Sequence, residues 1–203
     1  MNALDQARQE LTSEGNAGWF EVARAARLEI ADELNQWLRR LRQYRSEGEW
    51  VSTVLDGASR FVHRIAVFRV NDGALSLRGQ HELNLPEQLC FPVMSAGAFA
   101  SAITSKDSVI ALRTRSEVGE ALSSSEAGER VCVVPIANGS RVAAVLFGIG
   151  EEDMNVNALE LIAGIASAVL EQRSNASIHT QVAVTGGIEK GNTFPQTPNS
   201  NAS

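Results

Sequence analysis

The chain has 203 residues, of which 44% are hydrophobic, so we expect one domain of ordinary size with terminal extensions. Its net charge of -6 and its pI of about 5.2 argue against a nucleic-acid-binding protein, which usually carries a basic surface. Two cysteines are too few for a disulfide framework, and no apolar run reaches the ~18 residues of a membrane-spanning helix. We therefore expect a cytoplasmic protein that binds neither nucleic acid nor membrane.

The first part of the chain predicts a disordered N-terminus over residues 1–17 and a long helix over residues 18–47. Apolar residues in this helix recur at alternating steps of three and four, which is typical of coiled-coil packing. Four of them are predicted to form the interface of a homodimer: Ile30, Leu34, Trp37 and Leu41. The alternative is that the helix packs on its own domain. The sequence Glu47-Gly48-Glu49 is predicted to break the helix.

Residues 48–173 show the pattern of one folded domain. A second helix over Trp50–Val62 is followed by a predicted β-hairpin, in which Asn71-Asp72-Gly73 forms the turn. The hairpin strands are Arg64–Val70 and Ala74–Arg78, and an irregular stretch, His81–Phe91, comes next.

The second half of this domain repeats the alternation of helix and strand. The predicted elements are a helix over Ala96–Thr104, a strand over Val109–Leu112, hairpin strands over Val131–Ile136 and Arg141–Ile149, and a helix over Met154–Arg173. The second hairpin is almost wholly apolar, which indicates strands covered on both faces. Residues 174–203 are rich in Ser, Asn, Thr, Gly and Pro and are predicted to be a disordered tail. The order of elements predicts an α+β fold with a central, mainly antiparallel sheet flanked by helices.

The segment from about Trp50 to Gln172 resembles the GAF domain family. The first hairpin, the helix and strand over Gly97–Leu112, and the paired strands over Cys132–Ile149 carry the resemblance, and the last helix agrees with it. Ala144 stands where the family usually has a glycine. The resemblance implies a small-molecule pocket between the sheet and its covering helix and loops, although a fold does not specify the ligand.

The resemblance places six candidate ligand-binding residues around this pocket: Phe91, Met94, Ser95, Phe99, Thr104 and Arg113. Alternatively, Phe91 and Phe99 fill the core and Arg113 is solvated. The signatures of cyclic-nucleotide, bilin and haem binding are not found, so the cofactor is left unknown. No His/Cys cluster with metal-ligand spacing is present, so no metal site is predicted.

One enzyme built on the GAF fold, free methionine-R-sulfoxide reductase, needs a nucleophilic thiolate and a resolving thiol. Cys132 lies in a predicted central strand and Cys90 has no evident partner, so we expect no catalysis. The leading hypothesis is a small-molecule sensor in signal transduction that acts through a helix-mediated dimer on a downstream protein. The alternative is a ligand-free scaffold or dimerisation module. A cavity near Phe99 would favour the sensor, and a filled space would favour the scaffold.

Overall fold

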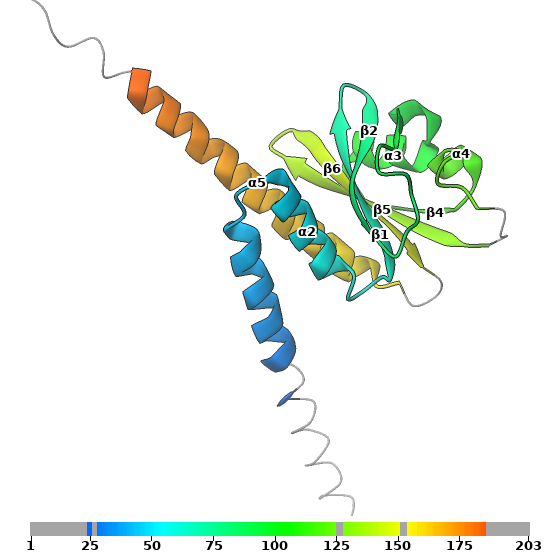
Figure 1. Ribbon diagram of the computed structural model, residues 1–203, viewed down its shortest axis with the longest axis horizontal. Helices are drawn as coiled ribbons and strands as arrows, with labels where there is room; N and C mark the ends of the chain where they lie inside the picture. Colours follow the sequence, from blue (N-terminus) through cyan, green and yellow to red (C-terminus); the bar gives the residue numbers. More distant parts are fainter. Residues whose placement is uncertain (1–23, 26–27, 125–127, 151–153, 186–203) are drawn as a thin grey trace, which may run out of the picture.

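The computed structural model describes residues 24–25, 28–124, 128–150 and 154–185 (Figure 1). It contains one six-stranded sheet in the order β3-β2-β1-β6-β5-β4, and every neighbouring pair is antiparallel. The strands are β1 (Arg64–Asn71), β2 (Ala74–His81), β3 (Cys90–Pro92), β4 (Val109–Leu112), β5 (Arg130–Asn138) and β6 (Arg141–Gly150). The predicted α+β fold with a flanked antiparallel sheet is confirmed.

Both predicted hairpins form, and the first has its predicted turn. Asp72 and Gly73 connect β1 to β2 with φ values of 47° and 76°, and two positive φ angles are the mark of a type I′ turn. Gly139 lies in the turn between β5 and β6 with a φ of 60°. Glycine adopts this conformation without the steric cost of a β-carbon.

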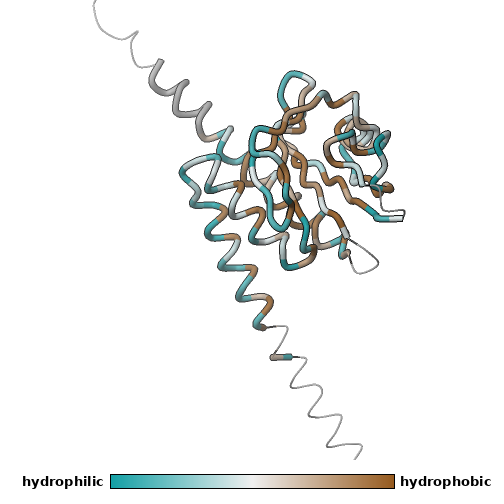
Figure 2. Tube along the Cα trace, turned by 45° about the vertical axis from the view of Figure 1, so that its right-hand side comes forward, coloured by the Kyte–Doolittle hydropathy of each residue, from teal (hydrophilic) through white to brown (hydrophobic). Residues whose placement is uncertain are grey.

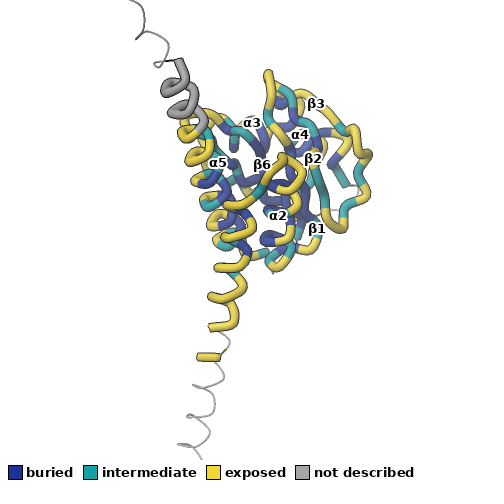
Figure 3. Tube along the Cα trace, turned by 60° about the vertical axis from the view of Figure 1, so that its left-hand side comes forward, coloured by how far each residue is buried: buried dark blue, intermediate teal, exposed yellow. Residues whose placement is uncertain are grey.

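Helices cover both faces of the sheet. On one face lie α2 (Glu47–Ala58), α5 (Val156–Thr185) and the N-terminal helix, which is helical over residues 28–42; α3 (Gly97–Ser105) and the short α4 (Arg115–Val118) lie on the other (Figure 1). We call the first the helix-pair face, after α2 and α5, and the second the α3 face. Side chains of β1 alternate between them, with Val67 in the first core and Phe68 in the second. The central strands are therefore apolar on both faces, as predicted, and are buried (Figures 2 and 3).

The first helix ends earlier than predicted, at Arg42 and not at residue 47, and its predicted start at residue 18 lies outside the described residues. The sequence Glu47-Gly48-Glu49 is the first turn of α2 and not a break between helices. Ser46 is the N-cap: its hydroxyl accepts a hydrogen bond from the Glu49 backbone N–H, and the Glu49 carboxylate accepts one from the Arg45 N–H. A Ser followed three residues later by Glu is a helix-start signal. It explains why α2 begins at Glu47 and not at the predicted Trp50.

The last helix is longer than predicted, because α5 continues to Thr185. The expectation of a disordered tail from residue 174 is therefore wrong for residues 174–185. The sequence has no glycine or proline between Gly164 and Gly186, and extending an existing helix costs far less than nucleating a new one. The expected disorder of residues 1–17 and the end of the tail lie outside the described residues.

Candidate functional site

The α3 face, where the resemblance implies a ligand pocket, is filled by aromatic rings. Phe99 stacks on Phe147 with ring centroids 5.5 Å apart, and it meets Phe68 and Phe91 edge-on at 5.7 Å. Phe68, Phe99 and Phe147 are fully buried. These side chains occupy the space between the sheet and α3, so the core-filling role of Phe91 and Phe99 agrees with the structure.

Three of the other predicted pocket residues are exposed. Met94 is 86% exposed, and Ser95 and Thr104 are exposed as well. The Ser95 hydroxyl donates a hydrogen bond to the Pro92 carbonyl at 2.7 Å. Three of the six residues are thus at the surface while Phe99 is buried, and a ligand-binding role for any of them stays a prediction.

Arg113 has polar partners within its own domain. Its Nη1 lies 2.7 Å from Glu129 Oε2, and its Nε donates to the Leu122 carbonyl at 2.6 Å. Arg64 contacts the other Glu129 oxygen. Burial by itself would raise the pKa of Glu129, but the hydrogen bonds and charges of Arg113 and Arg64 hold that pKa below its usual value. This cluster ties the connection between β4 and β5 to the start of β1.

The predicted dimer-interface residues divide into two groups. Trp37 and Leu41 are buried in the core of their own domain, which contradicts their assignment to an exposed dimer surface. Ile30 is 55% exposed and Leu34 is half-buried. The first helix therefore packs on its own domain at its C-terminal end, and its earlier part projects past the domain (Figure 3).

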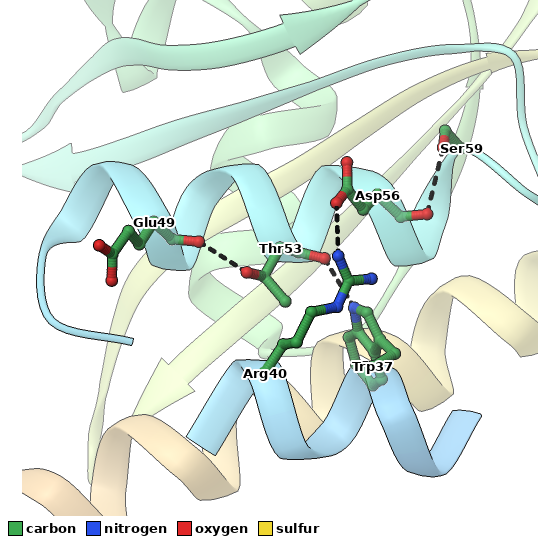
Figure 4. Close-up of polar contacts among 6 residues, drawn as sticks. All are labelled: Trp37, Arg40, Glu49, Thr53, Asp56 and Ser59. Atoms are coloured by element: carbon green, nitrogen blue, oxygen red, sulfur yellow. Dashed lines mark hydrogen bonds and ion pairs between the residues drawn. The ribbon is translucent and has the colours of Figure 1, made fainter. Parts of the chain in front are cut away.

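The docking contact between the first helix and α2 is built around Trp37 (Figure 4). The Trp37 indole N–H donates a hydrogen bond to the Thr53 carbonyl at 2.6 Å. A β-carbon added at Gly57 would lie only 2.5 Å from Trp37 Nε1, so the glycine makes room for the indole. Arg40 forms an exposed ion pair with Asp56 at 3.2 Å beside this contact.

A pocket of about 180 Å³ opens on the helix-pair face, next to the connection between the first helix and α2. Its walls come from α2, β1, β2, the β5–β6 hairpin and α5. The apolar part of the lining includes Trp50, Val51, Val67, Ala144 and Leu170, and the polar part includes Glu47, Arg69, Arg78 and Asn138. This site was not predicted from sequence. One signal for it was available in the sequence. Arg69 follows Ile65 and Val67 at the two-residue spacing of the β1 side chains that face the helix-pair core, where a charged residue is unexpected.

The two thiols are far apart and in different environments. Cys90 is exposed on β3, whereas Cys132 is buried in β5. Burial, assisted by the charge of Glu160, raises the pKa of Cys132 to about 12. Four strand spacings of ~4.8 Å separate β3 from β5, which gives roughly 19 Å across the sheet.

Within the described residues, no group of three or more His, Cys, Asp or Glu side chains is placed to hold a metal ion. The helices in this part of the chain are too short or too polar for any of them to cross a membrane.

Comparisons with known proteins identify the fold. No family model matches the sequence, and no curated protein matches it. Among solved structures, the nlh2 GAF domain of A. aeolicus in an inactive state is similar, with a TM-score of 0.55 and 12% identity over 72% of this chain and 98% of that one. Residues 122 to 287 of a methyl-accepting chemotaxis protein match with a TM-score of 0.55 and 14% identity, over 70% of this chain and 97% of that chain.

A third match is the GAF domain of an Acinetobacter phosphoenolpyruvate-protein phosphotransferase, with a TM-score of 0.54 and 11% identity over 73% of this chain and 96% of that chain. The free methionine-R-sulfoxide reductase of Neisseria meningitidis is also similar, with a TM-score of 0.51 and 15% identity over 70% of this chain and 89% of that one. At such identities the likeness concerns the fold and not the activity. The chain has the GAF fold.

Proposed function

We propose that this chain is a regulatory GAF module in signal transduction that works through its helices and binds no ligand between the sheet and α3. The observation that carries the proposal is the full burial of Phe99 against Phe68 and Phe147. A small molecule could enter that space only by displacing packed rings. The scaffold hypothesis is thus favoured over a sensor whose pocket is built around Phe99.

The module acts as a homodimer, which is formed by the projecting part of the first helix. Ile30 and Leu34 lie at the same helical spacing as Trp37 and Leu41 and extend their apolar stripe beyond the domain. Trp37 and Leu41 are covered by the domain's own core, whereas Ile30 is exposed and Leu34 is only half-buried. A second copy related by two-fold symmetry would cover it, because the same surface on each subunit then contacts its counterpart.

The proposed module has no catalytic activity. A methionine-sulfoxide reductase would need an accessible thiolate with a second thiol nearby. The buried, high-pKa Cys132 and the distant Cys90 do not supply that pair. Two unpaired cysteines also fit the reducing cytoplasm in which we propose that the protein acts, on a downstream protein partner.

Light scattering of the full chain tests this proposal. We expect a dimer at micromolar concentration, and we expect Ile30→Asp together with Leu34→Asp to yield a folded monomer. Both side chains are at least partly exposed, so the substitution leaves the domain core intact. The matched control is Glu29→Ala with Asp32→Ala, two exposed changes on the same helix that should leave a dimer. A monomeric wild type, or a double Asp variant that stays dimeric, contradicts the proposal.

A further inference from the structure

The pocket on the helix-pair face lies on the opposite side of the sheet from the phenylalanine cluster. We propose that it binds a small carboxylate whose apolar body is about the size of a benzene ring. The proposal is independent of the dimer and of the packed α3 face. It rests on the size of the pocket, the charges at its rim and the state of Trp50.

The size of the pocket sets the size of the ligand. Its volume is about 180 Å³. Apolar protein cavities of roughly 150 Å³ are known to hold benzene. The lining beside Trp50, Val51 and Leu170 is suited to such a body, because an aromatic or branched aliphatic group would be covered by apolar side chains on more than one side.

The charges at the rim favour an anion. Arg69 and Arg78 both line the pocket, and Glu47 is the one acidic side chain of the lining. Arg69 is bound to Glu47 at 2.7 Å, but the Arg78 Nε lies 3.7 Å from the same oxygen, which is too long for a hydrogen bond. One carboxylate is thus shared by two guanidinium groups, and the rim keeps one unit of positive charge. A guanidinium binds a carboxylate with two parallel hydrogen bonds, so Arg78 is the group placed to hold the ligand.

Another positive group lies close to the pocket. Tyr44 forms part of the lining, and the Arg173 guanidinium lies over its ring, 4.1 Å from the centroid. Arg173 also contacts the Tyr44 carbonyl. Its charge adds to the positive potential at the entrance without being required for a direct contact.

Trp50 supplies a separate observation. The side chain is more than nine-tenths buried, and its Nε1 has no hydrogen-bond partner among the described residues. Buried indole N–H groups usually have a partner, and leaving one unpaired is costly. Trp50 also lines the pocket, and an acceptor brought by the ligand would reach its buried Nε1 only if the ring turned toward the pocket.

Binding here would link three helical segments. The lining includes Tyr44 from the connection after the first helix, Trp50 from α2 and Leu170 from α5. A ligand that contacts all three is stabilised only when they are assembled. It would therefore favour the docked position of the first helix, because a ligand shifts an equilibrium toward the state that it binds better.

The test is a titration of the full chain with benzoate, followed by NMR of the tryptophan indole N–H signals. The chain has three tryptophans, so Trp50→Phe assigns the relevant signal. We expect a saturable shift of the Trp50 signal with a Kd on the order of 1 mM, as is reasonable for a ligand of about nine non-hydrogen atoms. Benzyl alcohol, a neutral molecule of similar size, should bind at least tenfold more weakly.

The variant Arg78→Met should weaken benzoate binding at least tenfold, since it removes the charge and keeps an apolar stem. The matched control is Arg115→Met, because Arg115 is exposed on α4 and pairs with Glu120 on the α3 face; it should leave binding unchanged. The proposal is overturned if the Trp50 signal does not respond, if benzyl alcohol binds equally well, or if Arg78→Met has no effect. A Trp50 signal that moves on dilution but not with benzoate would assign the pocket to a contact between copies and also overturn it.

Discussion

Gly57→Ala probes the docking of the first helix most directly. Alanine is a better helix former than glycine, so at an open helical position the change stabilises a protein by up to ~1 kcal/mol. At Gly57 the new methyl group would lie 2.5 Å from Nε1 and 2.6 Å from Cε2 of Trp37, so the indole must move. Its displacement forfeits burial worth ~1.5–3 kcal/mol and a hydrogen bond to Thr53 worth ~0.5–1.5 kcal/mol.

The balance predicts that Gly57→Ala lowers the free energy of unfolding by about 2 kcal/mol, despite its favourable helix propensity. Urea unfolding measures this change, and limited proteolysis around residues 43–46 reports whether the first helix has undocked. Gly48→Ala is the matched control, because its β-carbon would meet only Ser46 Oγ at 3.9 Å; it should not destabilise the protein.

A double-mutant cycle with Trp37→Ala completes the test of this contact. Once the indole is removed, Gly57→Ala should cost nothing further, because the two residues act through one contact. The reasoning is refuted if Gly57→Ala is neutral or stabilising, or if its cost is the same with and without Trp37.

Two further predictions concern the α3 face. Phe99→Ala should lower the free energy of unfolding, measured in urea, by about 3–5 kcal/mol, since it removes a fully buried ring. Met94→Ala, at an exposed position, should change it by less than ~0.5 kcal/mol. A mild effect of Phe99→Ala would mean that the space is not tightly filled. Because the folded-state pKa of Glu129 is lowered from 4.5, its ion pairs stabilise the protein above that pH, and this contribution is lost as the pH falls through the lowered value. Wild type should therefore be more stable than Glu129→Gln at neutral pH, and the difference should shrink under acid; a difference that is constant with pH would exclude a titrating Glu129 as its cause.

Much of the backbone could be predicted from local sequence. The Asn71-Asp72-Gly73 turn and the Gly139 turn need positive φ angles, which few residue types tolerate, so a short sequence specifies the hairpins. The strand Val109–Leu112 has its predicted limits. The start of α2 was predicted at Trp50 and not at Glu47, although Ser46 and Glu49 satisfy backbone donors within a single turn and are a local signal for it.

The short β3 and α4 were not predicted, because their stability comes from packing and not from a periodic pattern. β3 has three residues and forms an edge strand by pairing with β2. α4 is a four-residue helix, below the length at which helical periodicity can be recognised.

The sequence by itself determined the α+β class, the hairpins and the apolar central strands, because these depend on residues close together in the chain. Tertiary structure alone decided whether the candidate site is open or filled. Phe68, Phe91, Phe99 and Phe147 come from four separate segments, and only their arrangement in space shows that their rings pack together between the sheet and α3. The same holds for Trp37, because its helical spacing suits a dimer interface and a docked helix equally. Only the structure shows that Trp37 packs against Gly57 and donates a hydrogen bond to the Thr53 carbonyl.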